Sequence, residues 1–188
     1  MPEDKGCYIL YNVDQGSDDW KYMRKGKITM SNIGKVVGHA PYYKGTKYEP
    51  KVRNILAKKL NCEISETGFA VWKKDPRFGA SLDGIIDDEC GIEIKCPARM
   101  YGPILNYMRK KNPDPDDISH IWKSQYDQVI GNGVITGRKW MFFCVYGIED
   151  KLMFIQKVKV DYRYWKKELY RPSVEFYENY MEPIINEK

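Results

Sequence analysis

Long apolar runs, paired cysteines and clustered histidines are all missing from this sequence of 188 residues. No apolar run approaches the ~20 residues that a membrane-spanning helix needs, and residues 1–5 have no signal-peptide anatomy. The five cysteines, at positions 7, 62, 90, 96 and 144, are odd in number and include no C-x-x-C pair. This pattern argues against a zinc site, an iron–sulfur cluster and a disulfide framework, and indicates a reducing intracellular setting. The two histidines have no partner at metal-ligand spacing, so we expect both to be structural.

The overall amino-acid composition is typical of a globular protein. Hydrophobic residues make up 43% of the chain and aromatic residues 14%. The length allows a real core but not two full ones, which predicts a single domain spanning residues 1–188. A formal net charge of +5, with 15 tyrosines and 5 tryptophans, permits a nucleic-acid partner without requiring one.

The most informative stretch is Ser81-Leu82-Asp83-Gly84, followed ten residues after the aspartate by Glu93-Ile94-Lys95. Glu93 and Lys95 alternate with apolar residues, which is the period of a β-strand and puts both charged side chains on one face. The polar stretch 87–91 ends in glycine and indicates a hairpin connection. An antiparallel hairpin would bring Asp83 back beside Glu93.

Two carboxylates and a backbone carbonyl can hold a hard divalent cation such as Mg²⁺. Such a cation lowers the pKa of a bound water and stabilises charge on a phosphoryl group. Lys95, two residues from a metal ligand, could then position or deprotonate the water, or neutralise the phosphate. The alternative is a surface hairpin whose charged residues are merely solvated, because E-x-K triplets are common.

A second group of polar residues is expected near the N-terminus. Ser17 predicts the cap of a helix that runs to about residue 25, and a second helix is expected over 32–37, closed by Gly38. This arrangement brings Arg24 and Ser31 close together. A guanidinium beside hydroxyl and backbone N–H groups forms a natural phosphate pocket, while the alternative is an ordinary surface arginine and an ordinary N-cap serine.

The remaining pattern predicts a mixed β-sheet covered by helices, in the α/β class. A helix is expected over 47–60, with Glu49 in its first turn, where a glutamate usually complements the helix dipole. Further helices are expected over 100–111, over 118–130 with an end at Gly131-Asn132-Gly133, and over 162–185 with an interruption at Pro172. The expected strands are 8–13, a strand pair or one long strand over 62–73, 139–146 and 152–160.

Taken together, the sequence resembles the family of phage lambda exonuclease and the viral recombination (YqaJ-like) alkaline exonucleases. This family lies within the PD-(D/E)XK, or restriction-endonuclease-like, superfamily. Four blocks in the family's order carry the resemblance. They are Trp20-x-x-x-Arg24 with Ile28-Thr29-Met30-Ser31; Gly45-Thr46-Lys47-Tyr48-Glu49; Ser81-Leu82-Asp83-Gly84; and Gly91-Ile92-Glu93-Ile94-Lys95-Cys96-Pro97.

The resemblance implies a role for each matching residue. Asp83 and Glu93 would bind metal together with the Ile94 carbonyl, and Lys95 would be the catalytic lysine. Glu49 would border the metal site and ligate a second ion directly or through water. The resemblance also implies a 5′-phosphate pocket and a glutamine that helps to place the lysine and the water. These would be Arg24, Ser31 and Ser81 for the pocket, and Gln125 for the glutamine.

The sequence departs from the family pattern at three points. Leu82 replaces the proline that gives the superfamily its name, which is dispensable for metal chemistry. Gln128 is a second candidate for the site glutamine, and Gly131-Asn132-Gly133 has the character of a small insertion.

The resemblance implies a metal-dependent 5′→3′ exonuclease that acts on linear double-stranded DNA, prefers 5′-phosphorylated ends and leaves single-stranded tails for recombination. Mg²⁺, with Mn²⁺ as the alternative, would be bound as two ions. Expected partners are DNA ends, a single-strand annealing protein and further copies in a homotrimeric ring, inside a host cell and encoded by a virus or phage. The alternatives are a structure- or sequence-specific endonuclease of the same superfamily, and a non-catalytic module that binds DNA ends.

Overall fold

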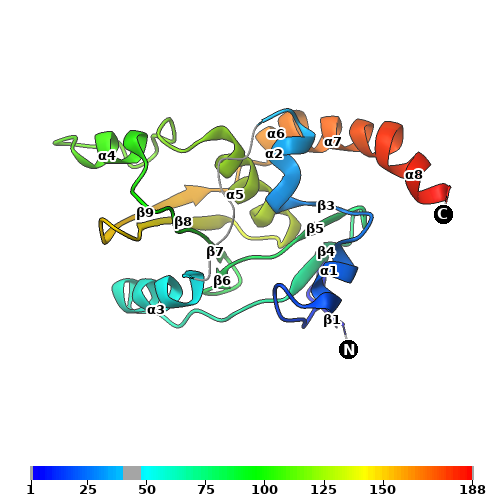
Figure 1. Cartoon of the computed structure of the whole chain (residues 1–188), viewed down its shortest axis with the longest axis horizontal. Coiled ribbons are helices and arrows are strands. Elements are labelled where there is room, and N and C mark those ends of the chain that lie inside the picture. Colours follow the sequence, from blue (N-terminus) through cyan, green and yellow to red (C-terminus); the bar gives the residue numbers. More distant parts are fainter. Residues whose placement is uncertain (1, 40–47, 188) are drawn as a thin grey trace.

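Two β-sheets form the centre of the protein in a computed structural model, which describes residues 2–39 and 48–187 (Figure 1). The first sheet has the order β1-β2-β4-β5-β3, with β3 parallel to β5 and the other neighbours antiparallel. Its strands are β1 (Glu3–Asp4), β2 (Tyr8–Tyr11), β3 (Ile28–Thr29), β4 (Phe69–Trp72) and β5 (Phe78–Ala80).

The second sheet has the order β6-β7-β8-β9, with β7 parallel to β8 and the other neighbours antiparallel. Its strands are β6 (Gly84–Ile85), β7 (Cys90–Lys95), β8 (Trp140–Gly147) and β9 (Leu152–Lys159). Both sheets are therefore mixed. The predicted α/β class, with a mixed sheet flanked by helices, is confirmed, although the strands form two sheets where one was expected.

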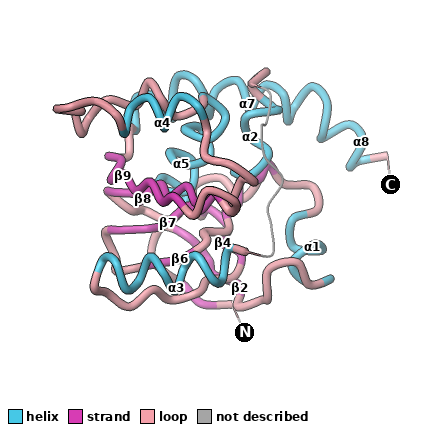
Figure 2. Tube along the Cα trace, turned by 60° about the vertical axis from the view of Figure 1, so that its left-hand side comes forward, coloured by secondary structure: helices cyan, strands magenta, loops and turns pink. Residues whose placement is uncertain are grey.

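Helices cover both faces of the second sheet, with α3 (Glu49–Leu60) on one side and α4 (Gly102–Met108) and α5 (Lys123–Ile135) on the other (Figure 2). The buried side chains of β7 explain this layering. Ile92 and Ile94 pack against Val52 and Leu56 of α3, so the alternate residues of the strand face α5. All six residues of β7 are buried, because helices cover both faces.

Several predicted elements are confirmed, and some boundaries are wrong. Ser17 caps α1 (Asp18–Arg24) by accepting a hydrogen bond from the Trp20 N–H, as expected. Within 62–73 only β4 forms a strand, and Ser65 adds an isolated bridge to Ile85. The second short helix consists of a 3₁₀ turn η1 (Met30–Asn32) and α2 (Ile33–Val36), and its neighbour Gly38 has a φ of +82°. The first residue of the helix predicted for 47–60 lies outside the described residues.

The glycine-flanked Asn132 does not end the helix that was predicted over 118–130. Instead α5 begins at Lys123 and continues through this segment to Ile135. The two glycines serve packing, because a Cβ on Gly131 would lie 2.2 Å from Met30 Sδ and one on Gly133 would lie 2.4 Å from Val160 Cγ2. Tertiary packing therefore overrides the low helix propensity of glycine here.

The C-terminal helix projects from the body of the protein and is not interrupted at Pro172 (Figure 1). It runs through α6 (Tyr162–Tyr164), η2 (Trp165–Tyr170), α7 (Arg171–Phe176), η3 (Tyr177–Met181) and α8 (Glu182–Asn186). The segments η2 and η3 have π-helical turns and end directly before the turns that contain Pro172 and Pro183. The wider turns explain how the helix continues past residues that cannot donate an N–H.

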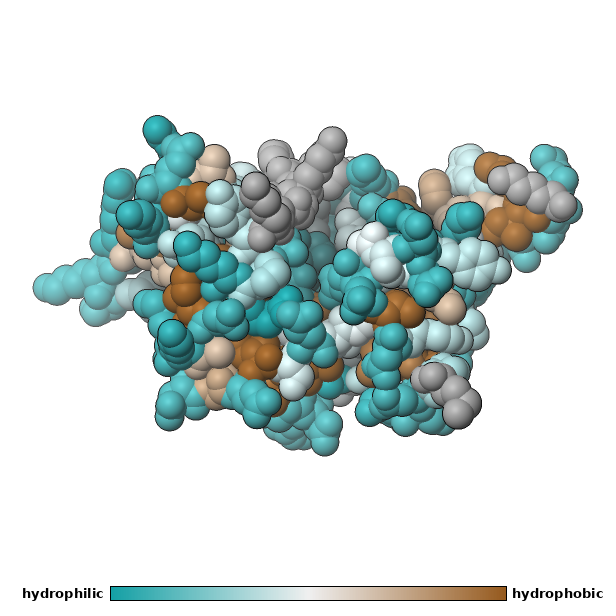
Figure 3. All heavy atoms as spheres, turned by 60° about the horizontal axis from the view of Figure 1, so that its bottom comes forward, coloured by the Kyte–Doolittle hydropathy of each residue, from teal (hydrophilic) through white to brown (hydrophobic). Residues whose placement is uncertain are grey.

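The face shown in Figure 3 is mainly hydrophilic, with apolar side chains in scattered groups. On the projecting helix, Tyr180, Ile184 and Ile185 are 63%, 59% and 42% exposed. None of the helices in the described ranges is long and apolar enough to cross a membrane.

Candidate active site

The hairpin predicted between Asp83 and Glu93 is present. Strands β6 and β7 pair with Gly84 opposite Ile92, and the Asp83 N–H donates to the Ile92 carbonyl at 3.2 Å. The Asp83 carboxylate then turns toward β7, where Oδ2 accepts a hydrogen bond from the Ile94 N–H at 2.7 Å. The first carboxylate is therefore fixed by the backbone of the strand that carries the second.

Glu93 and Lys95 project from the α5 face of β7 and form a buried ion pair. Lys95 Nζ lies 2.6 Å from Glu93 Oε1, and the two residues are only 6% and 1% exposed. Two amides from α5 complete their surroundings. Gln128 Oε1 accepts a hydrogen bond from Lys95 Nζ at 2.9 Å, and Asn132 Nδ2 donates one to Glu93 Oε2 at 2.8 Å.

Burial and mutual repulsion perturb the pKa values of this cluster. Burial raises the pKa of Glu93 to about 8, and the neighbouring Asp83 and Glu49 carboxylates add to the rise. Burial also raises the pKa of Asp83. For Lys95, burial alone would lower the pKa, but the carboxylates of Glu93 and Asp83 outweigh it and the net shift is upward. Ionising these two carboxyl groups is therefore costly while no cation is bound.

The second predicted group, around Arg24, also forms. Arg24 Nη2 donates to the hydroxyls of Ser31 at 2.7 Å and Thr29 at 3.1 Å, and its guanidinium lies 3.9 Å from the centre of the Trp20 ring. The indole Nε1 of Trp20 donates to Ser81 Oγ at 2.9 Å, which joins the group to the segment before Asp83.

Arg24 forms no ion pair within residues 2–39 and 48–187. Burial lowers its pKa, because the groups that its guanidinium contacts in the described part of the chain are neutral hydroxyls and an aromatic ring, which do not offset the loss of hydration. Arg77, by contrast, is held by Asp75 and Glu178. A half-buried guanidinium with neutral neighbours and open hydroxyls is suited to bind an anion such as phosphate.

One cavity of about 240 Å³ joins the two groups. Glu49, at the start of α3, lines it as well, so this helix directs its N-terminus toward the hairpin. The segment Gly45-Thr46-Lys47 of the same sequence block lies outside the described residues. The lining residues are Gln15, Trp20, Arg24, Ser31, Glu49, Ser81, Asp83, Glu93, Ile94, Lys95 and Gln128.

Gln125 is the one predicted site residue that does not line this cavity. It is buried on α5, and its side-chain amide has no hydrogen-bond partner among the described residues. Gln128 lies three residues further along the helix and contacts Lys95 instead. Which glutamine faces Lys95 depends on the rotation of α5 against β7, which local sequence does not specify.

Sequence reasoning missed two residues at the site, Asn132 and Gln15, and one buried carboxylate on α5, Asp127. Asn132 was assigned to a helix end, yet its spacing of four from Gln128 is the signal that both belong to one helical face. Asp127 is fully buried, with Oδ2 at 2.5 Å from His39 Nδ1 and Oδ1 accepting from the Tyr164 hydroxyl at 2.6 Å. Gln15 donates to the carbonyls of Leu82 and Thr67, and no sequence pattern marked it.

The donors in the cavity fit a hard divalent cation. In the part of the chain that the structure describes, no three His, Cys, Asp or Glu side chains form a ready-made metal cluster. Asp83 and Glu93 nevertheless offer carboxylate oxygens beside the Ile94 backbone, with Glu49 on the same cavity. Burial raises the pKa of both carboxyl groups, and a bound cation would favour their charged forms.

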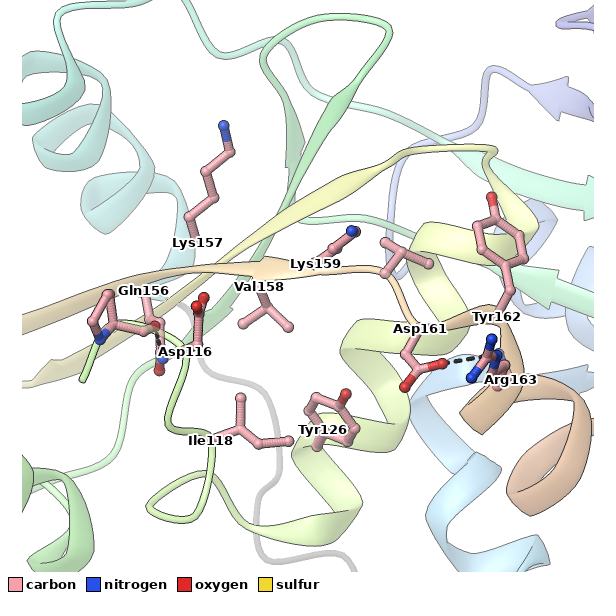
Figure 4. Close-up of a pocket in the computed structure, with 12 residues that line it drawn as sticks. Asp116, Ile118, Tyr126, Gln156, Lys157, Val158, Lys159, Asp161, Tyr162 and Arg163 are labelled. Carbon is pink, nitrogen blue, oxygen red and sulfur yellow. Dashed lines mark hydrogen bonds between the residues drawn. The ribbon is translucent and has the colours of Figure 1, made fainter.

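A larger cavity, of about 540 Å³, lies beside the outer edge of β9 and contains none of these residues (Figure 4). Two of its polar side chains, Asp161 and Gln156, stabilise the local fold. The Asp161 carboxylate caps the following helix by accepting from the N–H groups of Arg163 and Tyr164, and the Gln156 amide donates to the carbonyls of Pro115 and Asp117. The smaller cavity is therefore the better candidate for the active site.

Comparisons with known proteins agree with this geometry. The model of the YqaJ-like viral recombinase domain matches residues 39–139, which is more than half of the chain. The chain belongs to this family. A comparison with curated proteins found no match.

The fold is similar to that of solved exonuclease structures. A crystal structure of an alkaline exonuclease (LHK-Exo) from Laribacter hongkongensis matches with a TM-score of 0.69 and 22% identity, over 91% of this chain and 97% of that one. LHK-Exo in complex with dAMP gives the same values. A phage related exonuclease from Haemophilus somnus 129PT matches with a TM-score of 0.56 and 11% identity, over 86% and 96%. The fold is therefore restriction-endonuclease-like, as the sequence resemblance implied.

Proposed function

We propose that this protein is a metal-dependent 5′→3′ exonuclease that digests linear double-stranded DNA from 5′-phosphorylated ends and leaves single-stranded tails for recombination. One observation carries the proposal. A single cavity joins an acidic cluster with a lysine, at Asp83, Glu93 and Lys95, to a guanidinium that lacks an acidic partner among the described residues. The family and the exonuclease neighbours support a nuclease acting on DNA.

The two groups would have different tasks. Arg24, Ser31 and Ser81 would hold the terminal 5′-phosphate, and so fix the distance from the chain end at which the phosphodiester bond is cut. Asp83, Glu93 and the Ile94 carbonyl would hold Mg²⁺ or Mn²⁺, and Glu49 would ligate a second ion directly or through water. Bound divalent cations supply a nucleophilic water at neutral pH and stabilise charge on the phosphoryl oxygens.

Lys95 would act in its charged form. In the metal-free protein the neighbouring carboxylates of Glu93 and Asp83 raise its pKa, and the contacts with Glu93 and Gln128 fix its position. A protonated Lys95 can orient the attacking water or neutralise the scissile phosphate, but it cannot accept a proton.

The test is digestion of a linear duplex in Mg²⁺, comparing 5′-phosphate with 5′-hydroxyl ends, with a covalently closed circle alongside. We expect preferential loss of the phosphorylated strand and an intact circle. Lys95→Ala should lower the rate by at least about 10²-fold. Arg24→Ala should remove the preference for 5′-phosphate. The matched control Arg109→Ala, which changes an exposed arginine directly after α4 and outside the cavity lining, should keep it.

The alternative results of this experiment would indicate different functions. Cutting of the circle would retain the catalytic cluster but replace the exonuclease with an endonuclease. Binding of phosphorylated ends with no cutting in Mg²⁺ or Mn²⁺ would indicate a non-catalytic module. Full activity of Lys95→Ala would remove the assignment of the catalytic cluster.

The partners follow from the same proposal. By resemblance to the family, the working form is a homotrimeric ring around DNA, acting with a single-strand annealing protein inside the host cell of a virus or phage. The exposed apolar residues Tyr180, Ile184 and Ile185 are compatible with a contact between copies. Size-exclusion chromatography with light scattering tests the trimer directly.

A further inference from the structure

Helix α5 presents two side-chain amides to the two charged residues of β7. Gln128 and Asn132 are four residues apart on the helix, which corresponds to a rise of about 6 Å. Glu93 and Lys95 are two residues apart on the strand, which corresponds to about 6.6 Å. Because these two spacings nearly match, each amide contacts one charged group. Gln128 contacts Lys95, and Asn132 contacts Glu93.

Asn132 is fully buried, and its side-chain amide contacts the carboxylate of Glu93 directly. Its Nδ2 donates to Glu93 Oε2 at 2.8 Å, while Lys95 Nζ occupies Glu93 Oε1 at 2.6 Å. A carboxylate has about four lone-pair sites, so two donors fix the plane of the group and leave further sites free. An amide that donates to a carboxylate favours its charged form.

The flanking glycines allow Asn132 to be buried at this position. Side chains at residues 131 and 133 would collide with Met30 and Val160, both of which are buried in the core. With glycine on each side, α5 packs closely enough for the short Asn132 side chain to reach Glu93. The segment that has the character of an insertion in the sequence therefore brings Asn132 into contact with Glu93, one of the residues that line the cavity.

We propose that Asn132 is a positioning residue, which orients the Glu93 carboxylate for binding a divalent cation and for the reaction. The effect on the reaction rests on the proposed function. The effect on cation binding does not, because cation binding can be measured without DNA. Hydrogen-bond partners of metal ligands commonly affect metal affinity or activity by about 10–100-fold when they are removed.

The experiment compares Asn132→Leu with wild type in the full-length protein. Leucine has a similar volume but no donor. The control is Thr136→Val, which removes a buried hydroxyl one turn further along α5. Thr136 Oγ1 donates to the Asn132 backbone carbonyl at 2.7 Å and contacts no side chain of the site among the described residues. Mn²⁺ binding is measured by titration calorimetry without DNA, and kcat and KM are measured on a 5′-phosphorylated linear duplex in saturating Mg²⁺.

We expect Asn132→Leu to weaken Mn²⁺ binding by about 10–100-fold and to lower kcat, with KM for DNA ends unchanged because the Arg24 group is intact. Thr136→Val should match wild type in each measurement. If Asn132→Leu does not fold, as judged by circular dichroism, Asn132→Ala removes the donor without adding volume and allows the same comparison.

Equal Mn²⁺ affinity and equal kcat for Asn132→Leu and Thr136→Val would overturn the inference while leaving the proposed function intact. If wild type binds Mn²⁺ but does not cut DNA, the proposed function fails and the calorimetric comparison still decides the role of Asn132. If wild type binds no Mn²⁺, the inference fails outright.

Discussion

Lys95 Nζ donates a hydrogen bond to Gln128 Oε1 at 2.9 Å, whereas the amide of Gln125 has no hydrogen-bond partner among the described residues. The contact connects the charged face of β7 to α5, which is 28 or more residues away along the chain. It also distinguishes Gln128 from Gln125, the two glutamines that the sequence offered as candidates for the residue that helps to place Lys95.

The two glutamines should therefore respond differently to substitution. We expect Gln128→Leu to lower kcat about 10-fold or more, because Lys95 loses a partner that fixes its ammonium. Gln125→Leu should cause a smaller loss of activity and leave the protein at least as stable, because it replaces a buried amide that has no hydrogen-bond partner in the described ranges. Steady-state kinetics and thermal unfolding check both; a larger kinetic effect at Gln125 would contradict the assignment.

Trp20 should contribute to end recognition through two separable contacts. Trp20→Phe keeps a ring beneath Arg24 but loses the N–H bond to Ser81, and we expect KM for 5′-phosphorylated ends to rise about 5-fold. Trp20→Leu also removes the cation–π contact and should raise KM further, to about 10–50-fold in total. Rates on 5′-hydroxyl duplexes provide the comparison, since they should change little in either variant.

The stability of the metal-free protein should fall as the pH rises from 5 to about 8. The pKa of Glu93 is raised to about 8 in the folded state from 4.5, so in this window the folded state holds a proton that the unfolded state has lost. The raised pKa of Asp83 acts in the same direction. Lys95 is protonated in both states across this range, so it contributes no slope.

Thermal unfolding in EDTA across this pH range measures the effect. A change of about 1 kcal/mol corresponds to a Tm shift of about 2–4 °C for a protein of this size. Glu93→Gln should reduce the fall of Tm with rising pH. Mg²⁺ should stabilise wild type more at pH 8 than at pH 5. A wild-type Tm that stays constant or rises with pH in EDTA would be inconsistent with uncompensated buried carboxylates.

Gly131→Ala should destabilise the protein by about 1–3 kcal/mol, because the added Cβ would lie 2.2 Å from the sulfur of the buried Met30. The control is Gly102→Ala at the start of α4, where nothing lies within 4 Å of an added Cβ and the effect should stay within about 0.5 kcal/mol. Urea unfolding of the two variants measures the difference. Equal stability would mean that α5 can shift away from Met30 without cost.

The sequence by itself determined the local elements of the site. The alternation around Glu93 and Lys95 and the polar turn before them predicted the hairpin, because strand period and turn chemistry are local properties. Ser17 predicted the start of α1, and the short spacing between Arg24 and Ser31 predicted their contact. The four sequence blocks gave the family, and through it the expected role of each residue.

Only the tertiary structure decided how α5 meets β7. The rotation of this helix selects Gln128 over Gln125 and brings Asn132 to Glu93, and it depends on contacts with Met30 and Val160 from distant parts of the chain. Local propensity assigned the glycines around Asn132 to a helix end, because a single sequence does not reveal where a backbone must pack closely. The same burial raises the pKa of Glu93, since desolvation depends on what covers a residue and not on its neighbours in sequence.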